Sequence, residues 1–324
     1  MDTGNYFPVS FRFRVLFVSF GPENCGAQKL FRPRSTFNTN ASTTLHDKVK
    51  SQATNRASPV FMSSNSSFTV RVYNCSILIE TPSSEVYSLL DRHILPSLPR
   101  LETVAARPDI YVRVIQTDDQ LHLSIQGSPV KSTSTAKDLI VPLIKVLDDE
   151  IIARLDTLRA IHSGAVVWAE RAILLPGSTH SGKSSLVAEL VRRGATYFSD
   201  EFALIDPDGC VHPYPRPLLL RNGLPRQVPV LPEKLNASVG NAAAPVGWIF
   251  ALRYEPDCSW QVVPVPQSEA VLTLLKNTPH FLAESPGMLE SFQKVASGAK
   301  CYAGRRPDVV QAADEILRSI QDSA

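Results

Sequence analysis

Eight residues in the middle of the chain have the types and spacing of a phosphate-binding loop. Residues 177–184 read Gly-Ser-Thr-His-Ser-Gly-Lys-Ser, which matches the pattern G-x-x-x-x-G-K-[ST]. The two glycines permit a tight turn whose successive N–H groups point at an anion. Lys183 adds a mobile ammonium for the β- and γ-phosphates of ATP, and the Ser184 hydroxyl can bind Mg²⁺. The pattern predicts that ATP and Mg²⁺ bind at Gly177, Ser178, Thr179, His180, Ser181, Gly182, Lys183, Ser184 and Ser185.

Two adjacent acids follow the loop at a distance that suits chemistry on a bound nucleotide. Asp200 and Glu201 come at the end of an apolar run that begins at Ala195. Carboxylates beside a phosphate loop can bind the metal or remove a proton from an acceptor hydroxyl. An extended chain directs neighbouring side chains to opposite sides, so we expect the two acids to have different roles. A solvent-exposed acidic pair at the end of a strand is the alternative.

A strand and a helix must hold this loop in place. Residues 172–176 form a short apolar run typical of a buried strand. Residues 184–193 place four aliphatic side chains on one helical face, and Gly194 is a stop signal. The positive end of that helix adds to anion binding. His162 begins an earlier strand, which we expect to pair with residues 172–175 across a turn at 169–171. From its spacing alone, a single histidine is more often structural than catalytic.

The order of these residues resembles the C-terminal domain of HPr kinase/phosphorylase. The resemblance rests on His162, on Lys183 twenty-one positions later, on the acidic pair, and on residues 189–194 and 218–221. It covers about residues 158–222. The resemblance implies an α/β fold with a P-loop kinase core of the HPr kinase and phosphoenolpyruvate-carboxykinase type.

The resemblance also implies roles for the residues. Lys183 would bind phosphates, His162 would assist at the transferred phosphoryl group, and Asp200 and Glu201 would hold the proton acceptor and a metal contact. Ser184 and Glu201 are the expected metal ligands. The family transfers the γ-phosphoryl group of ATP to a serine of a small carrier protein, so we expect an acceptor hydroxyl on a protein serine or a small molecule. Members of the family often form oligomers, which makes a homo-oligomer possible for this chain.

Three positions depart from the family pattern. The acidic pair is Asp-Glu where the family has Asp-Asp, and His162 is followed by Ser163 before a glycine. Leu219 occupies the position of a metal-binding glutamate of the family. The last departure argues against the phosphorylase reaction and leaves a second hypothesis open, a nucleotide-binding regulatory module without catalysis. A carboxykinase-like enzyme would need further metal ligands, which the sequence does not offer.

The whole chain divides into three parts by composition and periodicity. Residues 1–66 are rich in Ser, Thr, Asn and basic residues and are predicted to be a largely disordered extension, with an organellar transit peptide or a misplaced start codon as alternatives. Residues 67–157 predict a small α+β domain, with strands at 68–73, 75–80, 111–115 and 120–125 and helices at 84–92 and 138–156. Residues 158–324 predict the nucleotide-binding domain. Its later elements are strands at 246–254 and 259–265 and helices at 268–276, 287–297 and 308–320.

Two groups of charged residues within these parts are interpreted as ordinary surface residues. Asp148, Asp149 and Glu150 are predicted to form a solvated helical face. Arg305 and Arg306 are predicted to lie in a surface patch, with a phosphate contact as the alternative.

Composition excludes several classes of protein. The 324 residues carry 33 basic and 31 acidic groups, a net charge of +2, which argues against a dedicated nucleic-acid binder. No apolar run reaches the roughly 18 residues that a membrane span needs. Five scattered cysteines, none in a C-x-x-C spacing, are typical of a chain in a reducing compartment and predict a cytoplasmic protein.

Overall fold

A six-stranded sheet comes first among the described residues. In the computed structural model the described residues are 66–94, 100–101, 107–178, 181–221, 223–279 and 287–322, so nearly all of the predicted N-terminal extension lies outside them. The sheet has the order β3-β1-β2-β4-β5-β6. The strands are β1 (Ser66–Val72), β2 (Cys75–Thr81), β3 (Arg100–Leu101), β4 (Ile110–Thr117), β5 (Gln120–Ile125) and β6 (Ser128–Thr133). β2 and β4 are parallel and the other neighbours are antiparallel. The four strands expected between 68 and 125 are confirmed.

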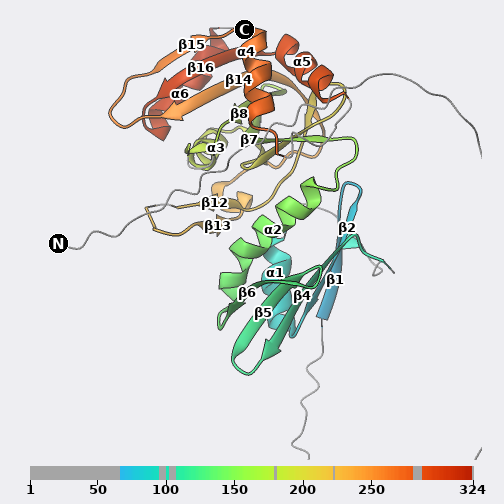
Figure 1. The fold of residues 1–324 in the computed structure, drawn as a ribbon. Helices are drawn as coiled ribbons and strands as arrows, with labels where there is room; N and C mark the ends of the chain where they lie inside the picture. Colours follow the sequence, from blue (N-terminus) through green and yellow to red (C-terminus); the bar gives the residue numbers. More distant parts are fainter. Residues whose placement is uncertain are drawn as a thin grey trace, which may run out of the picture. The chain divides into compact units, whose positions relative to one another are not determined.

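Two helices cover one face of this sheet. Alternation directs Ile110, Val112 and Val114 of β4 to the same side, and all three are buried in one core with residues of both helices. The helices are α1 (Ser84–His93) and α2 (Ile140–Ile152), and the 3₁₀ turn η1 (Ala136–Leu139) leads into α2 (Figure 1). Ser83 caps α1, because its Oγ accepts from the Val86 N–H at 3.3 Å. Pro142 lies in the first turn of α2, where a missing N–H costs little.

An eight-stranded mixed sheet forms the second folded element. Its order is β11-β10-β7-β8-β14-β16-β15, and β9 pairs with β7 beside that path. β14 is parallel to both β8 and β16. The strands are β7 (Arg159–Trp168), β8 (Arg171–Pro176), β9 (Thr196–Ser199), β10 (Phe202–Ile205), β11 (Cys210–His212), β14 (Ala244–Tyr254), β15 (Gln261–Pro264) and β16 (Lys300–Arg306). The predicted hairpin of β7 and β8 is confirmed, and Ala169 and Glu170 form its turn with positive φ.

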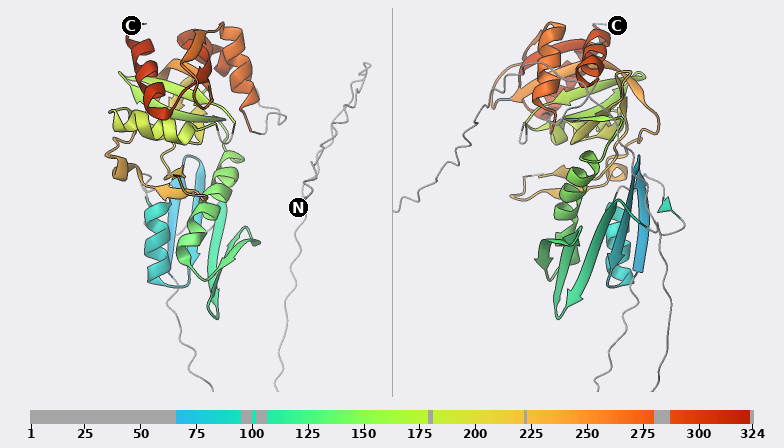
Figure 2. Two further views of the ribbon diagram at one scale, coloured as in Figure 1. Left: turned by 90° about the vertical axis from the view of Figure 1, so that its left-hand side faces the viewer. Right: turned by 45° about the vertical axis from the view of Figure 1, so that its right-hand side comes forward.

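Helices pack on both faces of the second sheet. Ile173 and Leu175 of β8 belong to a core that includes α3 (Lys183–Arg192) and α6 (Val309–Gln321). The alternate residues Ala172 and Leu174 belong to a core with α4 (Gln267–Lys276) and α5 (Met288–Gly298). Figure 2 shows the two helix pairs on opposite sides of the strands. The chain is therefore a mixed α/β protein, and the helices expected at 268–276, 287–297 and 308–320 are confirmed within about a residue or two at each end.

One strand pairing differs from the expectation. The strand at 259–265 was expected to pair with the strand before it, but β15 pairs with β16, which lies between β14 and β15. Residues 300–306 carry Gly304 and three basic residues, so the apolar pattern did not predict β16. The chain reaches β16 through α4 and α5, and a helical crossover of this kind permits the parallel pairing with β14.

A proline-rich segment lies between β11 and β14. It contains β12 (Leu218–Leu220), β13 (Val228–Val230) and the 3₁₀ turn η2 (Pro232–Leu235), and the two strands form an antiparallel hairpin. Leu219 and Tyr214 of this segment are buried in the core of the first sheet. No helix of the described residues is long and apolar enough to cross a membrane.

Candidate active site

The predicted phosphate loop connects β8 to α3. β8 ends at Pro176 and α3 begins at Lys183, so the strand, loop and helix follow one another as expected. Gly182 is the N-cap of α3 with a φ of 80°, a left-handed conformation that favours glycine. The Lys183 Nζ donates to the carbonyls of Gly177 at 2.8 Å and Ser178 at 3.0 Å. Burial lowers the pKa of Lys183, and the nearby Glu201 and Asp200 oppose that shift. Thr179 and His180 lie outside the described residues.

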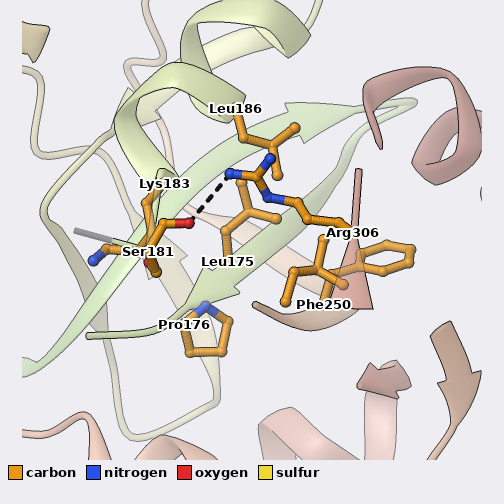
Figure 3. Close-up of a pocket in the computed structure, with 8 residues that line it drawn as sticks. Leu175, Pro176, Ser181, Lys183, Leu186, Phe250 and Arg306 are labelled. Carbon is orange, nitrogen blue, oxygen red and sulfur yellow. Dashed lines mark hydrogen bonds between the residues drawn. The ribbon is translucent and has the colours of Figure 1, made fainter. Parts of the chain in front are cut away.

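Arg306 holds the loop through the carbonyls of Ser181 and Gly182, contrary to the expectation that it lies in a surface patch. Its side chain is buried in the structure, and its Nη2 donates at 3.2 Å to the carbonyls of both Ser181 and Gly182. Figure 3 shows the guanidinium of Arg306 directed at Ser181 across Leu175 and Phe250. A Cβ on residue 182 would collide with this guanidinium, so the contact also favours glycine there. Arg305, by contrast, is exposed and pairs with Glu255 at 3.2 Å, as expected of a surface residue.

We expect the contact between Arg306 and the loop to matter for nucleotide affinity. Replacing Arg306 with methionine removes the guanidinium that holds the two carbonyls, so the loop should lose its fixed shape and the affinity for Mg-ATP should fall roughly tenfold. Titration calorimetry measures the affinity, and circular dichroism verifies that the variant is folded. Arg305→Met is the matched control and should bind as wild type does. Equal affinity in the Arg306 variant would mean that the loop needs no such support.

His162 and Glu201 form a hydrogen-bonded pair beside the loop. β10 pairs with β7 so that Phe202 lies opposite His162, which brings the preceding Glu201 next to the histidine. The His162 Nε2 and Glu201 Oε1 atoms are 2.9 Å apart. The Glu201 side chain is 30% exposed, so an incoming molecule can reach it. Burial opposes its ionisation, but the His162 hydrogen bond and the charge of Arg216 outweigh burial and lower the pKa of Glu201.

Asp200 is more deeply buried than its neighbour, but residues 200 and 201 lie in a bend and both carboxylates reach Arg216, so the expected placement on opposite sides of an extended chain is wrong. The Asp200 side chain is fully buried, and its Oδ2 accepts from the Leu219 N–H at 3.2 Å. Burial raises the pKa of Asp200, although the charge of Arg216, the Leu219 hydrogen bond and the neighbouring Ser184 hydroxyl partly offset the shift. The acidic pair thus has one buried member that contacts the loop serine and one accessible member that contacts His162.

Arg216 joins these two acids to Asp148 of α2. No pattern in the sequence predicted a role for it. Its Nη2 is 3.4 Å from Asp200 Oδ1 and 3.2 Å from Glu201 Oε2, and its Nε is 3.4 Å from Asp148 Oδ2. Burial opposes the charge of this guanidinium, but the three carboxylates outweigh it and raise the pKa of Arg216. Its Nε and Nη1 have no hydrogen-bond partner among the described residues. Tyr214 completes the cluster by donating to Asp148 Oδ1 at 2.8 Å.

The expectation of a solvated acidic face on α2 is wrong for Asp148. That side chain is buried, whereas Asp149 is exposed and Glu150 lies between these extremes. Burial raises the pKa of Asp148 to about 7, with Arg216 and Tyr214 opposing the shift. A signal was present in the sequence, because Asp148 is four residues after Ile144 and three before Ile151, both of which are buried.

Leu219 provides no metal ligand, because its side chain is buried in the apolar core. Within the part of the chain that the structure describes, no group of three or more His, Cys, Asp or Glu residues could hold a metal ion. The adjacent oxygens of Ser184 and Asp200 nevertheless suit Mg²⁺, which is commonly held by one or two protein oxygens together with phosphates and water.

A cavity of about 430 Å³ lies next to the loop. Gly177 and Ser178 line one side, and Arg253, Tyr254 and Asn277 are among the residues that line the rest. A space of this size, with polar and aromatic walls beside a phosphate loop, can accommodate a small ligand.

Comparisons with known proteins do not assign this chain to a family. No family model matches the chain, and no curated protein matches it. Among solved structures, the chain is similar to the structure of the Hpr(Ser) kinase/phosphatase from Coxiella burnetii, with 15% sequence identity. The match covers 51% of this chain and 97% of that chain with a TM-score of 0.29. A likeness of this size carries no argument, so the functional conclusion depends on the residues of the site.

Proposed function

We propose that this protein is an ATP-dependent phosphotransferase with an HPr-kinase-like P-loop core, which transfers the γ-phosphoryl group of ATP to a hydroxyl. The observation that carries the proposal is the Glu201 carboxylate, which is accessible and hydrogen-bonded to His162 beside Lys183, with its pKa lowered by His162 and Arg216. A general base for phosphoryl transfer needs these properties, because it must accept a proton from the acceptor hydroxyl as the new bond forms.

The nucleotide would bind with its phosphates at the 177–184 loop. In the structure Lys183 donates to two loop carbonyls, and on binding the ammonium would exchange these for phosphate oxygens. The first turn of α3 would add its free N–H groups. The nucleoside would then extend into the cavity lined by Arg253 and Tyr254.

The transfer step uses Glu201 as the base and His162 as its positioning partner. The acceptor oxygen forms a bond to the γ-phosphorus, and the bond between that phosphorus and the bridging oxygen of ADP breaks. The proton of the acceptor hydroxyl passes to Glu201. His162 holds Glu201 through its Nε2 and keeps the carboxylate directed at the acceptor. Lys183 stabilises the charge on the transferred group.

Mg²⁺ would neutralise phosphate charge when bound. We propose that Ser184 and Asp200 hold it, since these two side chains are neighbours beside the loop. This assignment replaces the expected ligand Glu201 with Asp200 and leaves Glu201 for proton transfer.

A non-catalytic nucleotide-binding module is the second candidate. One observation favours it, namely that Leu219 places an apolar side chain where the resembled family has a metal-binding glutamate. Such a protein would bind Mg-ATP without turning it over.

The two candidates are separated by measuring ADP formation from Mg-ATP. The full chain is incubated with Mg-ATP in the presence of an array of serine-containing peptides and, separately, a panel of small polyols. Phosphorylated product and stoichiometric ADP support the phosphotransferase. Measurable ATP binding without ADP formation under any of these conditions would contradict it and leave the regulatory module.

A further inference from the structure

A groove of about 680 Å³ lies between α2 and the β12–β13 hairpin. Four of its lining side chains are basic and exposed, namely Lys131, Lys137, Lys145 and Arg226. Asp138 is the single acid among the lining residues. It lies 3.4 Å from Arg226, but both side chains face solvent, so this pair neutralises little of the charge. We call this feature the basic groove.

The floor of the basic groove is aliphatic. Val141 and Pro142 of α2 face Val228 and Pro229 of β13 across it, and all four are partly buried. The described lining contains no Phe, Tyr or Trp on which a nucleic-acid base could stack. An apolar floor with a cationic rim suits an extended polypeptide that carries both aliphatic and acidic side chains.

Both walls of the basic groove are linked to the acidic pair of the candidate active site, α2 through Arg216 and the hairpin by direct contact. On α2, Lys145 is one turn before Asp148, which pairs with Arg216 and through it with Glu201. On the hairpin, Pro229 lies opposite Leu219, whose N–H donates to Asp200. A segment bound in the basic groove therefore lies against the two elements that position the catalytic carboxylates.

The chain's own N-terminal segment is a poor occupant of this groove. Residues 1–60 carry eight Lys and Arg residues against three acids, so their charge has the same sign as that of the groove. Charge complementarity points to an acidic partner.

We propose that the basic groove docks an acidic segment of the polypeptide that carries the acceptor hydroxyl. The statement that this partner is the phosphoryl acceptor rests on the proposed function.

The test measures binding of a labelled peptide library to the full chain by fluorescence anisotropy. Each 12-residue peptide has a fixed serine, with Glu, Asp, Leu or Val at the other positions, and a neutral library replaces Glu and Asp with Gln and Asn. The groove variant combines Lys131→Glu, Lys137→Glu and Lys145→Glu. The control variant combines Arg71→Glu, Lys234→Glu and Lys300→Glu, which makes the same charge change at exposed residues outside the groove.

We expect the acidic library to bind wild type and the control variant alike, and to bind the groove variant at least roughly tenfold more weakly. Binding should also weaken at high salt. No binding of the acidic library, equal binding of the neutral library, or equal loss in both variants would overturn the proposal. Binding of anionic phosphatidylserine vesicles in place of peptides would overturn it as well. Failure of the proposed function is a separate result, since peptide binding lost only in the groove variant, together with an absence of ADP formation, would leave a docking site without a kinase.

Discussion

Replacing Glu201 with glutamine is expected to lower phosphoryl transfer by roughly 10²- to 10⁴-fold, the range that a general base contributes. The amide has nearly the same shape as the carboxylate but cannot accept the proton of the acceptor hydroxyl. The Mg-ATP affinity should stay within about threefold of wild type, because the Glu201 side chain forms its hydrogen bonds with His162 and Arg216. Single-turnover transfer of the γ-phosphoryl group, to water or to a serine peptide, measures the first quantity and calorimetry the second.

Asp200→Asn is the matched comparison, since it makes the same chemical change at the adjacent residue. Asp200 is buried and neighbours Ser184, so loss of its charge should weaken the Mg²⁺ dependence of nucleotide binding as well as transfer. A Glu201→Gln variant that transfers at the wild-type rate would contradict the assignment of the base. A Glu201→Gln variant that loses ATP affinity and transfer to the same extent would contradict the division of roles between the two acids.

Arg216→Met is expected to cost about 3–5 kcal/mol in the free energy of unfolding at neutral pH, as is typical when one partner of a buried ion pair is removed. The substitution leaves three carboxylates without their shared cation, and two of them, Asp148 and Asp200, are almost fully buried. Urea unfolding measures the loss. Arg226→Met is the control, because its exposed pair with Asp138 should contribute less than about 1 kcal/mol.

The pH dependence separates an ionic role of Arg216 from simple packing. Without the guanidinium, the three ionised carboxylates repel one another and destabilise the fold. Protonation at low pH removes this repulsion. The destabilisation by Arg216→Met should therefore be larger at pH 8 than at pH 5. An effect that is the same at both values would mean that Arg216 acts by filling space, and that it does not position Glu201 through its charge.

The local elements of the fold could be predicted from the sequence because their signals lie within a few residues of one another. Alternation in residues 110–125 indicated two strands, and the Ser83 cap and the apolar spacing of α1 indicated a helix. The strand, loop and helix around Gly182 have a motif with a physical reason at each position. The order of strands in the sheet had no such signal, because β16 is separated from its neighbour β14 by two helices and contains Gly304 and basic residues.

The candidate site was predictable only in part for a related reason. Lys183, Asp200 and Glu201 were found from types and spacing and His162 from the family resemblance, and the structure brings them together. Arg216 forms its cluster with acids that are 15 to 68 residues away, so no local pattern describes it. One hint existed, a lone charge between two prolines in the apolar segment 213–220.

The central claim is that residues 177–184 bind the phosphates of ATP, and calorimetry with Mg-ATP on wild type and Lys183→Ala tests it most directly. The ammonium of Lys183 is the main cation that the loop can offer to the β- and γ-phosphates, and charge-assisted hydrogen bonds of this type are the strong ones. We predict measurable binding by wild type and at least a roughly tenfold loss in the variant, which corresponds to about 1.4 kcal/mol. Binding of equal strength in both proteins, or binding by neither, would contradict the assignment of the loop and the phosphotransferase with it.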